Sequence, residues 1–294
     1  MLDDATLVTA LRSAWGWTPA SVTALDTGMN SRTWWVHDRG VRRIAKWVPA
    51  GEAEHLRAGV AAAAYAASSG LGTGTARPGR DGRDGVEVAG GLLVLLDEVP
   101  GRELSGEEPD DDVAIGRTLA RAHRATVGRR AEGAWEFPWV DPDATHLAID
   151  ADVRSAVRVA VAAVDAIPAD DLTTGICHGD PAPEAFLRAG VEVGLIDWGS
   201  CVNGPLLYDL ASAAMYLGGL DQAGPLLAAY SLAGGPVPDA EVSRHAPTLL
   251  RWRWAVQADY FAGRIAADDR TGPDADEGHR RGLADARRRL VDEG

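Results

Sequence analysis

The sequence predicts an α+β chain in which a strand-rich N-terminal lobe is followed by a mainly helical C-terminal lobe. Alternating and continuously apolar runs typical of strands dominate the first hundred residues, whereas helical periodicity dominates the remainder. A buried apolar run then meets a Pro100-Gly101 break, which is typical of a boundary. We therefore expect an N-terminal lobe over 1–97, a linker over 98–101 and a C-terminal lobe over 102–294, with a cleft between the lobes.

The N-terminal elements follow from local composition. An amphipathic pattern predicts the first helix, alternation with an Asp-Arg-Gly turn predicts a hairpin, and an alanine-rich stretch predicts a second helix. A polar turn then separates two strands, and the second of these is apolar throughout and so should be buried. The expected elements are helix 4–15, hairpin 25–48 turning at 38–40, helix 52–68, polar turn 79–85 and strand 91–96.

The C-terminal elements are mostly helices, and the last of them is basic. One short apolar run, 193–196, reads instead as a strand. The expected helices span 110–127, 150–166, 205–218, 221–233, 240–268 and 278–291.

Composition limits the class of protein. The 294 residues allow a large core, no apolar run has the length of a membrane span, and no segment resembles a signal peptide. The two cysteines, Cys177 and Cys201, favour a reducing compartment, so we expect a cytoplasmic protein without a membrane partner. A net charge of −14 argues against nucleic acid. It suits a cationic small ligand, although it serves solubility equally well.

Two carboxylates are the strongest chemical signal in the chain. Asp180 follows His-Gly in an expected tight turn, and Asp197 ends the apolar run 193–196. A hairpin between them would bring both carboxylates together, so that one could act as a base and the other could hold a metal ion. Phosphoryl transfer needs little more than such positioning and charge neutralisation.

Three short motifs in this order, His178-Gly179-Asp180, Ile196-Asp197-Trp198 and Tyr208-Asp209-Leu210, resemble the aminoglycoside phosphotransferase and choline kinase family. The resemblance spans about 27–267. It implies a two-lobed, protein-kinase-like fold and a kinase that transfers phosphate to a hydroxyl of a small molecule. It also implies ATP, with GTP as the alternative, and Mg²⁺.

The resemblance assigns roles to four of these residues. Asp180 matches the catalytic aspartate, which accepts a hydrogen bond from the acceptor hydroxyl. Asp197 matches the metal-binding aspartate. His178 and Asp209 match residues that brace the catalytic loop.

By the same resemblance, five residues would bind the nucleotide. Lys46, the chain's single lysine, matches the strand lysine that contacts phosphates, although a solvent-facing strand lysine would look alike. Asn30 and Ser31 lie where backbone amides would cradle phosphate, as an ordinary hairpin turn also could. The Asp97 carbonyl and the Val99 amide would hold adenine at the linker.

The chain departs from the family pattern at two places. Ala185 stands where the family has an asparagine that binds a second Mg²⁺, and we expect the Glu184 carboxylate to replace it; a solvent-facing Glu184 and a single metal are the alternative. The helix expected to supply a glutamate to Lys46 has no acid over 58–67. Either Glu52 or Glu54 reaches back, or Lys46 is held otherwise.

The acceptor side is less specific. Trp254 and Tyr260 could form an aromatic wall and Asp259 could meet a substrate amine, but aromatic residues at helical spacing are also typical of a core. We expect an antibiotic as acceptor, because the acidic chain suits cationic drugs. An amino alcohol, homoserine or a sugar is the alternative. A nucleotide-binding pseudokinase is the other alternative, and the two departures motivate it.

Overall fold

The N-terminal part of the structure is an antiparallel sheet. A computed structural model describes residues 2–25, 31–108, 110–269 and 275–293 of the chain. Within these residues the strand order is β1-β2-β3-β5-β4, and every neighbouring pair is antiparallel. The strands are β1 (Ser21–Leu25), β2 (Arg32–Asp38), β3 (Val41–Pro49), β4 (Gly85–Val88) and β5 (Gly91–Asp97).

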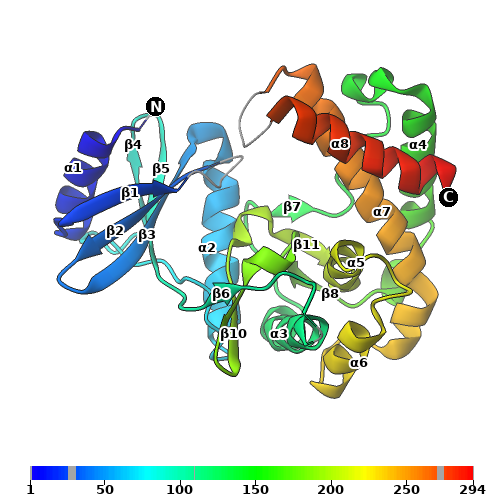
Figure 1. The fold of residues 1–294 in the computed structure, drawn as a ribbon, viewed down its shortest axis with the longest axis horizontal. Helices are drawn as coiled ribbons and strands as arrows, with labels where there is room; N and C mark the ends of the chain where they lie inside the picture. The colour runs from blue at the N-terminus through cyan, green and yellow to red at the C-terminus, as the bar shows by residue number, and fades with distance from the viewer. Residues whose placement is uncertain (1, 26–30, 109, 270–274, 294) are drawn as a thin grey trace.

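A helix covers each face of this sheet (Figure 1). Helix α1 (Asp4–Trp15) packs on the face that carries Ala45 and Trp47, while α2 (Ala53–Ala67) packs on the face that carries Val48. Side chains alternate between the faces of a strand, so Lys46 lies on the α2 face together with Val48. That face turns toward the rest of the chain.

The C-terminal part is mainly helical, with two small sheets near α2 (Figure 1). Its helices are α3 (Asp111–Thr126), α4 (Ala151–Asp165), α5 (Leu207–Tyr216), α6 (Gly224–Leu232), α7 (Asp239–Ala266) and α8 (Ala275–Arg287). One sheet has the order β10-β9-β6 and the other β7-β11-β8. Their strands are β6 (Arg102–Glu103), β7 (Trp135–Glu136), β8 (Thr174–Cys177), β9 (Phe186–Ala189), β10 (Glu192–Leu195) and β11 (Val202–Pro205). In the part of the chain that the structure describes, no helix is both long and apolar enough to cross a bilayer.

The predicted helices and strands occur in the expected order. The strands β1, β6, β7, β8 and β11 were not predicted, and two predicted bounds need correction. The predicted hairpin over 25–48 was wrong at its start: Leu25 ends β1, and the hairpin of β2 and β3 begins at Arg32. The helix expected from 205 begins at Leu207, because Pro205 still pairs with Thr174 of β8. At the second of these places the partner strand β8 lies far back along the chain, so the local pattern does not show it; at the first, β1 is a separate strand that pairs with the nearby β2.

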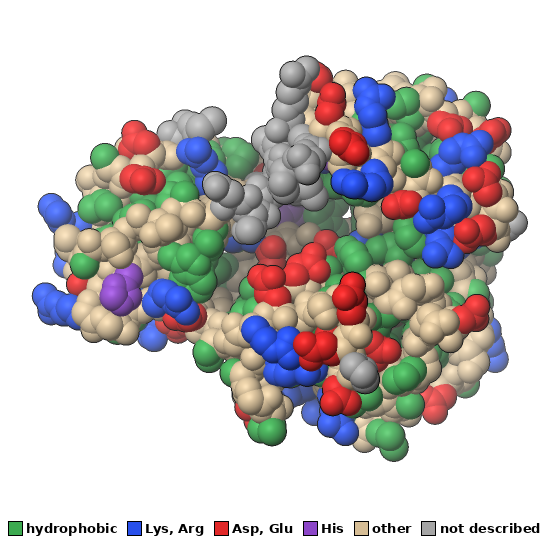
Figure 2. Space-filling view, in the orientation of Figure 1, with side chains coloured by type: hydrophobic (Ala, Val, Ile, Leu, Met, Phe, Trp, Pro, Cys, Tyr) green, Lys and Arg blue, Asp and Glu red, His purple; other side chains and the backbone are tan. Residues whose placement is uncertain are grey.

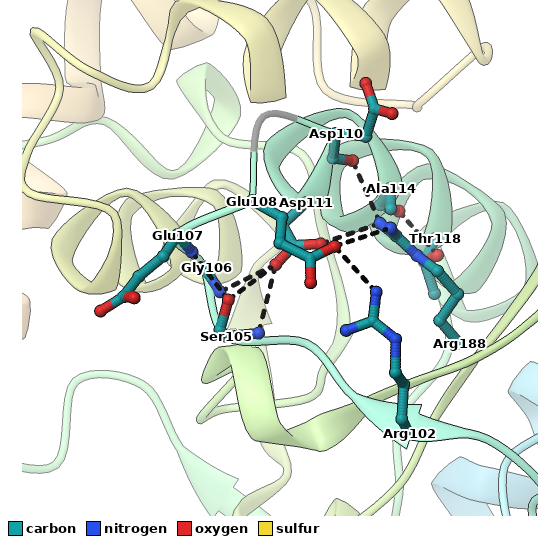
Figure 3. Close-up of polar contacts among 10 residues, drawn as sticks. All are labelled: Arg102, Ser105, Gly106, Glu107, Glu108, Asp110, Asp111, Ala114, Thr118 and Arg188. Carbon is teal, nitrogen blue, oxygen red and sulfur yellow. Dashed lines mark hydrogen bonds and ion pairs between the residues drawn. The ribbon is translucent and has the colours of Figure 1, made fainter.

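A buried carboxylate fixes the segment that follows Gly101. Asp111, at the start of α3, is fully buried and accepts hydrogen bonds from the Ser105 and Gly106 amides at 3.1 and 3.0 Å. Arg188 of β9 donates to the other oxygen at 2.9 Å (Figure 3). A Cβ on Gly106 would lie 3.0 Å from Pro183. The segment is therefore held between α3, β9 and the loop that carries Asp180.

Helix α2 touches the C-terminal part through a glycine. A Cβ on Gly59 would lie 2.6 Å from the carbonyl oxygen of Trp198, the residue after Asp197. Real Cβ atoms essentially never come so close to a backbone oxygen. The side of α2 that faces Trp198 therefore has no space for a larger residue.

Gly59→Ala is predicted to destabilise the protein by about 1–3 kcal/mol in urea unfolding, because α2 and Trp198 must move apart. The same change inside a helix ordinarily stabilises by about 0.5–1 kcal/mol, so the sign of the effect is diagnostic. Gly51→Ala is the matched control: its Cβ meets no atom within 4 Å, and a change within about 0.5 kcal/mol is expected. A stabilised Gly59→Ala protein would show that the contact is not tight.

Candidate active site

The loop after β8 carries Asp180, and its path depends on Gly179. Gly179 has a φ of +91°, and a Cβ there would lie 1.9 Å from the Ser200 carbonyl oxygen. Only glycine tolerates both the positive φ and this backbone approach. The chain therefore turns sharply between His178 and Asp180, and the Asp180 side chain emerges 46% exposed.

Asp209 holds the same loop from beneath. Its fully buried carboxylate accepts hydrogen bonds from the His178 amide at 2.7 Å and the Gly179 amide at 2.9 Å. His123 Nε2 lies 3.0 Å from the same carboxylate and must donate, because an ionised carboxylate only accepts. Burial alone would raise the pKa of Asp209, but the hydrogen bonds and positive partners hold it below its usual range.

The second acid-bearing segment is tied to the first. His178 Nε2 donates to the Ile196 carbonyl at 2.8 Å, and its ring packs edge-on against Trp198. Asp197 follows directly, after the hairpin of β9 and β10, in the left-handed region with a φ of +64°. Aspartate is one of the few non-glycine residues found there, and such residues cluster at functional sites. His178 thus connects the segments that carry Asp180 and Asp197.

Lys46 crosses from the N-terminal sheet to this hairpin. Its Nζ lies 2.5 Å from Asp197 Oδ1, and its side chain is only 15% exposed, whereas that of Asp197 is 65% exposed. The Lys46 ammonium holds the pKa of Asp197 below its usual range. Neither of the two glutamates considered for Lys46 contacts it: Glu54 of α2 lies 3.7 Å from Arg57, and Glu52 just before α2 forms no hydrogen bond or ion pair with Lys46. Lys46 is therefore held by Asp197 instead.

Asp180 has two protein partners that sequence reasoning missed. The Tyr216 hydroxyl donates to its Oδ1 at 2.6 Å, and Arg253 Nη2 donates to the same atom at 2.7 Å. Arg253 also donates to the Tyr216 hydroxyl at 3.0 Å and is only 4% exposed. The one available signal was a charged residue between Trp252 and Trp254 on a helix expected to be partly buried.

The donor set fits a magnesium ion that takes most of its ligands from elsewhere. Asp197 offers an exposed carboxylate, and Mg²⁺ prefers carboxylate oxygens together with phosphate and water. Ala185 lies beside this segment, since its carbonyl accepts from the Ile196 amide at 2.9 Å, but its methyl group cannot bind a metal. Glu184 is exposed. No three acidic, histidine or cysteine side chains cluster around a metal-sized space among the described residues.

The remaining nucleotide residues lie around β2 and β5. Ser31 is half-buried just before β2, while Asn30 lies outside the described residues. Arg77 Nε donates to the Asp97 carboxylate at 2.6 Å. This contact does not involve the Asp97 backbone carbonyl, whose hydrogen bond to adenine stays a prediction. No described residue accepts a hydrogen bond from the Val99 amide, so its N–H could donate to a ligand.

The three residues expected at the acceptor side do not share one surface. Asp259 Oδ1 lies 2.6 Å from His146 Nε2, and the Arg289 guanidinium lies over Trp254. Tyr260 is seven residues from Arg253, two turns further on the same face of α7. Tyr260 accepts a hydrogen bond from Arg264 at 3.0 Å. Of the three, only Tyr260 lies on the face of α7 that points to Asp180.

Figure 2 shows the molecule hollowed between the sheet-rich and helical parts, with acidic side chains gathered along the hollow. Lys46 reaches Asp197 across the same two parts of the chain. These residues therefore combine exposed carboxylates, a lysine and a linker amide that no described residue accepts from. Such a set can hold a nucleotide phosphate, a divalent cation and a hydroxyl group.

Asp209→Asn is predicted to cost about 3 kcal/mol of unfolding free energy at pH 7.5, because two backbone amides and His123 lose an anionic acceptor. A depressed folded-state pKa stabilises above the unfolded pKa of about 3.9, and the contribution disappears as pH falls through the folded value. Urea unfolding should therefore give a deficit retained at pH 5.5. Asp221→Asn, at an exposed site, is the control; equal stabilities of the two variants would contradict the account.

The comparisons with solved structures show the fold. An amicoumacin kinase in complex with AMP-PNP, Ca²⁺ and its ligand is similar at a TM-score of 0.72 and 17% identity, covering 99% of this chain and 94% of that one. A choline/ethanolamine kinase family protein from Mesorhizobium loti is similar at a TM-score of 0.65 and 19% sequence identity, and the match covers 92% of this chain and 87% of that one. A spectinomycin phosphotransferase is similar at a TM-score of 0.67 and 10% sequence identity, and the match covers 97% of this chain and 94% of that one. No curated protein sequence matches the chain.

The predicted protein-kinase-like fold is thus confirmed, and so is the resemblance on which it was based. The sequence profile described as the phosphotransferase enzyme family matches residues 21–247, which is most of the chain. Since that match includes Lys46, Asp180, Asp197 and Asp209, the chain belongs to the phosphotransferase enzyme family and is a small-molecule kinase.

Proposed function

We propose that the protein transfers the γ-phosphate of ATP, with Mg²⁺, to a hydroxyl group of an antibiotic. The observation that carries the chemistry is the direct contact of Lys46 with Asp197, beside the loop that presents Asp180. The proposal is supported by a cation, Lys46, next to the exposed carboxylate of Asp197, with the half-exposed Asp180 on the adjoining loop. GTP is the alternative donor.

Each residue then has a distinct task. Lys46 contacts the nucleotide phosphates and neutralises part of their charge. Asp197 holds Mg²⁺, which when bound screens the phosphate oxygens and orients them. Asp180 accepts a hydrogen bond from the acceptor hydroxyl and takes its proton as the phosphoryl group is transferred. The Val99 amide and the Asp97 carbonyl hold adenine at the linker.

The antibiotic acceptor is supported by charge and by similarity. The chain has a net charge of −14, and acidic side chains gather along the hollow (Figure 2). Both features favour cationic ligands. Two of the similar structures are described as kinases of amicoumacin and spectinomycin. An amino alcohol is the second candidate, because it is also cationic and because a choline/ethanolamine kinase family protein is similar as well.

The test is ADP release from ATP and Mg²⁺ across pooled antibiotics and pooled amino alcohols. Release with an antibiotic pool supports the proposal, and release with the amino alcohols alone supports the second candidate. Asp180→Asn is expected to lower turnover at least about a hundredfold while ATP affinity, measured by calorimetry, stays within about twofold. Retained turnover in this variant would remove the role of Asp180.

Glu184→Gln tests the second departure from the family pattern. If the exposed Glu184 carboxylate replaces the missing asparagine as a ligand, the variant should need about tenfold more Mg²⁺ for half-maximal turnover. Glu192→Gln, an exposed glutamate in β10, is the control. An unchanged Mg²⁺ titration for Glu184→Gln would favour a single metal held by Asp197.

A pseudokinase is the rival from another class, and Ala185 is the observation that favours it. Its side chain is buried beside Ile196 and offers no ligand. A protein that binds ATP with Mg²⁺ but releases no ADP with any pool would support this rival.

A further inference from the structure

The Asp180 carboxylate is held asymmetrically. Both of its protein partners, Tyr216 and Arg253, donate to Oδ1, at 2.6 and 2.7 Å. No described residue donates to Oδ2. Because the side chain is 46% exposed, Oδ2 remains open to a ligand while Oδ1 is fixed.

Arg253, the cation that fixes Oδ1, is buried at this contact. Arg253 is 4% exposed, and both of its hydrogen bonds to described residues go to Asp180 and Tyr216. Its Nε has no partner among them. Burying a guanidinium is costly unless a carboxylate compensates it, so the position of Arg253 is defined by Asp180.

The tyrosine completes a closed triangle. Tyr216 donates to Asp180 and accepts from Arg253 at 3.0 Å, and the guanidinium also lies over its ring. Burial raises the pKa of the Tyr216 hydroxyl above its usual value, so the hydroxyl keeps its proton as a donor. Tyr216 ends α5 and Arg253 lies in the middle of α7, and these two helices pack against each other.

We propose that Arg253 and Tyr216 are positioning residues that hold Oδ1 of Asp180 so that Oδ2 alone faces the acceptor hydroxyl. This inference rests on the proposed function, since it assigns the orientation of the catalytic carboxylate. Without these two donors the Asp180 side chain could adopt other χ1 and χ2 angles. A half-turn about χ2 only exchanges two equivalent oxygens, but any other angle would misplace the acceptor. Misplacement by about 1 Å can cost about a hundredfold in rate.

The pairing also sets the local charge that an acceptor meets. Arg253 compensates the charge of Asp180, so the attacked hydroxyl approaches a nearly neutral pair rather than an isolated anion. The attraction of a cationic acceptor must then come from the other acidic side chains that gather along the hollow (Figure 2). The ammonium group of the acceptor is accordingly expected away from the reacting hydroxyl.

The test compares Arg253→Met, Arg253→Lys and Tyr216→Phe with the unmodified protein, using the acceptor that gives ADP release. Methionine fills much of the space without the charge, whereas lysine keeps the charge without the planar fork. We expect kcat to fall about 10- to 100-fold for Arg253→Met, and less for the other two. The Kd for ATP with Mg²⁺, measured by calorimetry, should change by less than about twofold. Arg244→Met, on an exposed part of α7, is the matched control and should keep full kcat.

Chemical rescue separates positioning from a purely structural role. In Arg253→Ala, millimolar guanidinium is expected to restore part of the lost kcat, whereas urea at the same concentration, of similar shape but uncharged, should not. If Arg253→Met and Arg253→Lys keep full kcat, the inference is overturned while the kinase assignment stands. Equal rescue by urea would likewise overturn it. If the unmodified protein releases no ADP with any acceptor, the proposed function has failed instead.

Discussion

The contact between Lys46 and Asp197 is the interaction on which the rest of the site depends. It joins the N-terminal sheet to the hairpin of β9 and β10, and it lies beside the place where α2 meets Trp198 through Gly59. Both connections are close contacts, and together they hold the two parts of the chain in the arrangement seen. That arrangement brings Lys46, the Asp197 carboxylate and the Asp180 loop together between the two parts of the chain.

Helix α2 carries no acid over 58–67 that could contact Lys46, and it meets the C-terminal part through Gly59. A helix that approaches the Trp198 carbonyl so closely has no space for a long side chain at Gly59. Lys46 instead contacts the carboxylate that would bind the metal. In the absence of nucleotide the pair compensates its own charges, and phosphate and metal can replace each partner when ATP binds.

Beneath the hollow, a second layer of buried polar groups fixes the loop. Asp209 binds two consecutive amides of that loop, while His178 ties the loop to Ile196. Arg253 and Tyr216 act on the side chain of Asp180 rather than on its backbone. The backbone of the loop and the side chain of Asp180 are thus held by different residues, so substitutions can test the two roles separately.

Much of the fold and part of the site could be predicted from the sequence. Periodicity predicted the helices, the three ordered motifs singled out Asp180, Asp197 and Asp209, and the family resemblance added Lys46. Strand β1 was not predicted because its five residues are mostly exposed, so their apolar pattern is weak. The contact of Arg253 with Asp180 was not predicted because the two residues are far apart along the chain and a helical arginine ordinarily points to solvent.

The most direct measurement is ATP affinity by calorimetry, with and without Mg²⁺, for the unmodified protein, Lys46→Met and Asp197→Asn. Lys46→Met should weaken ATP binding about tenfold or more in both conditions, because a phosphate contact is lost. Asp197→Asn should bind metal-free ATP at least as well as the unmodified protein, yet gain little affinity from Mg²⁺. If Mg²⁺ strengthens binding to Asp197→Asn as much as to the unmodified protein, the metal is held elsewhere and the account is contradicted.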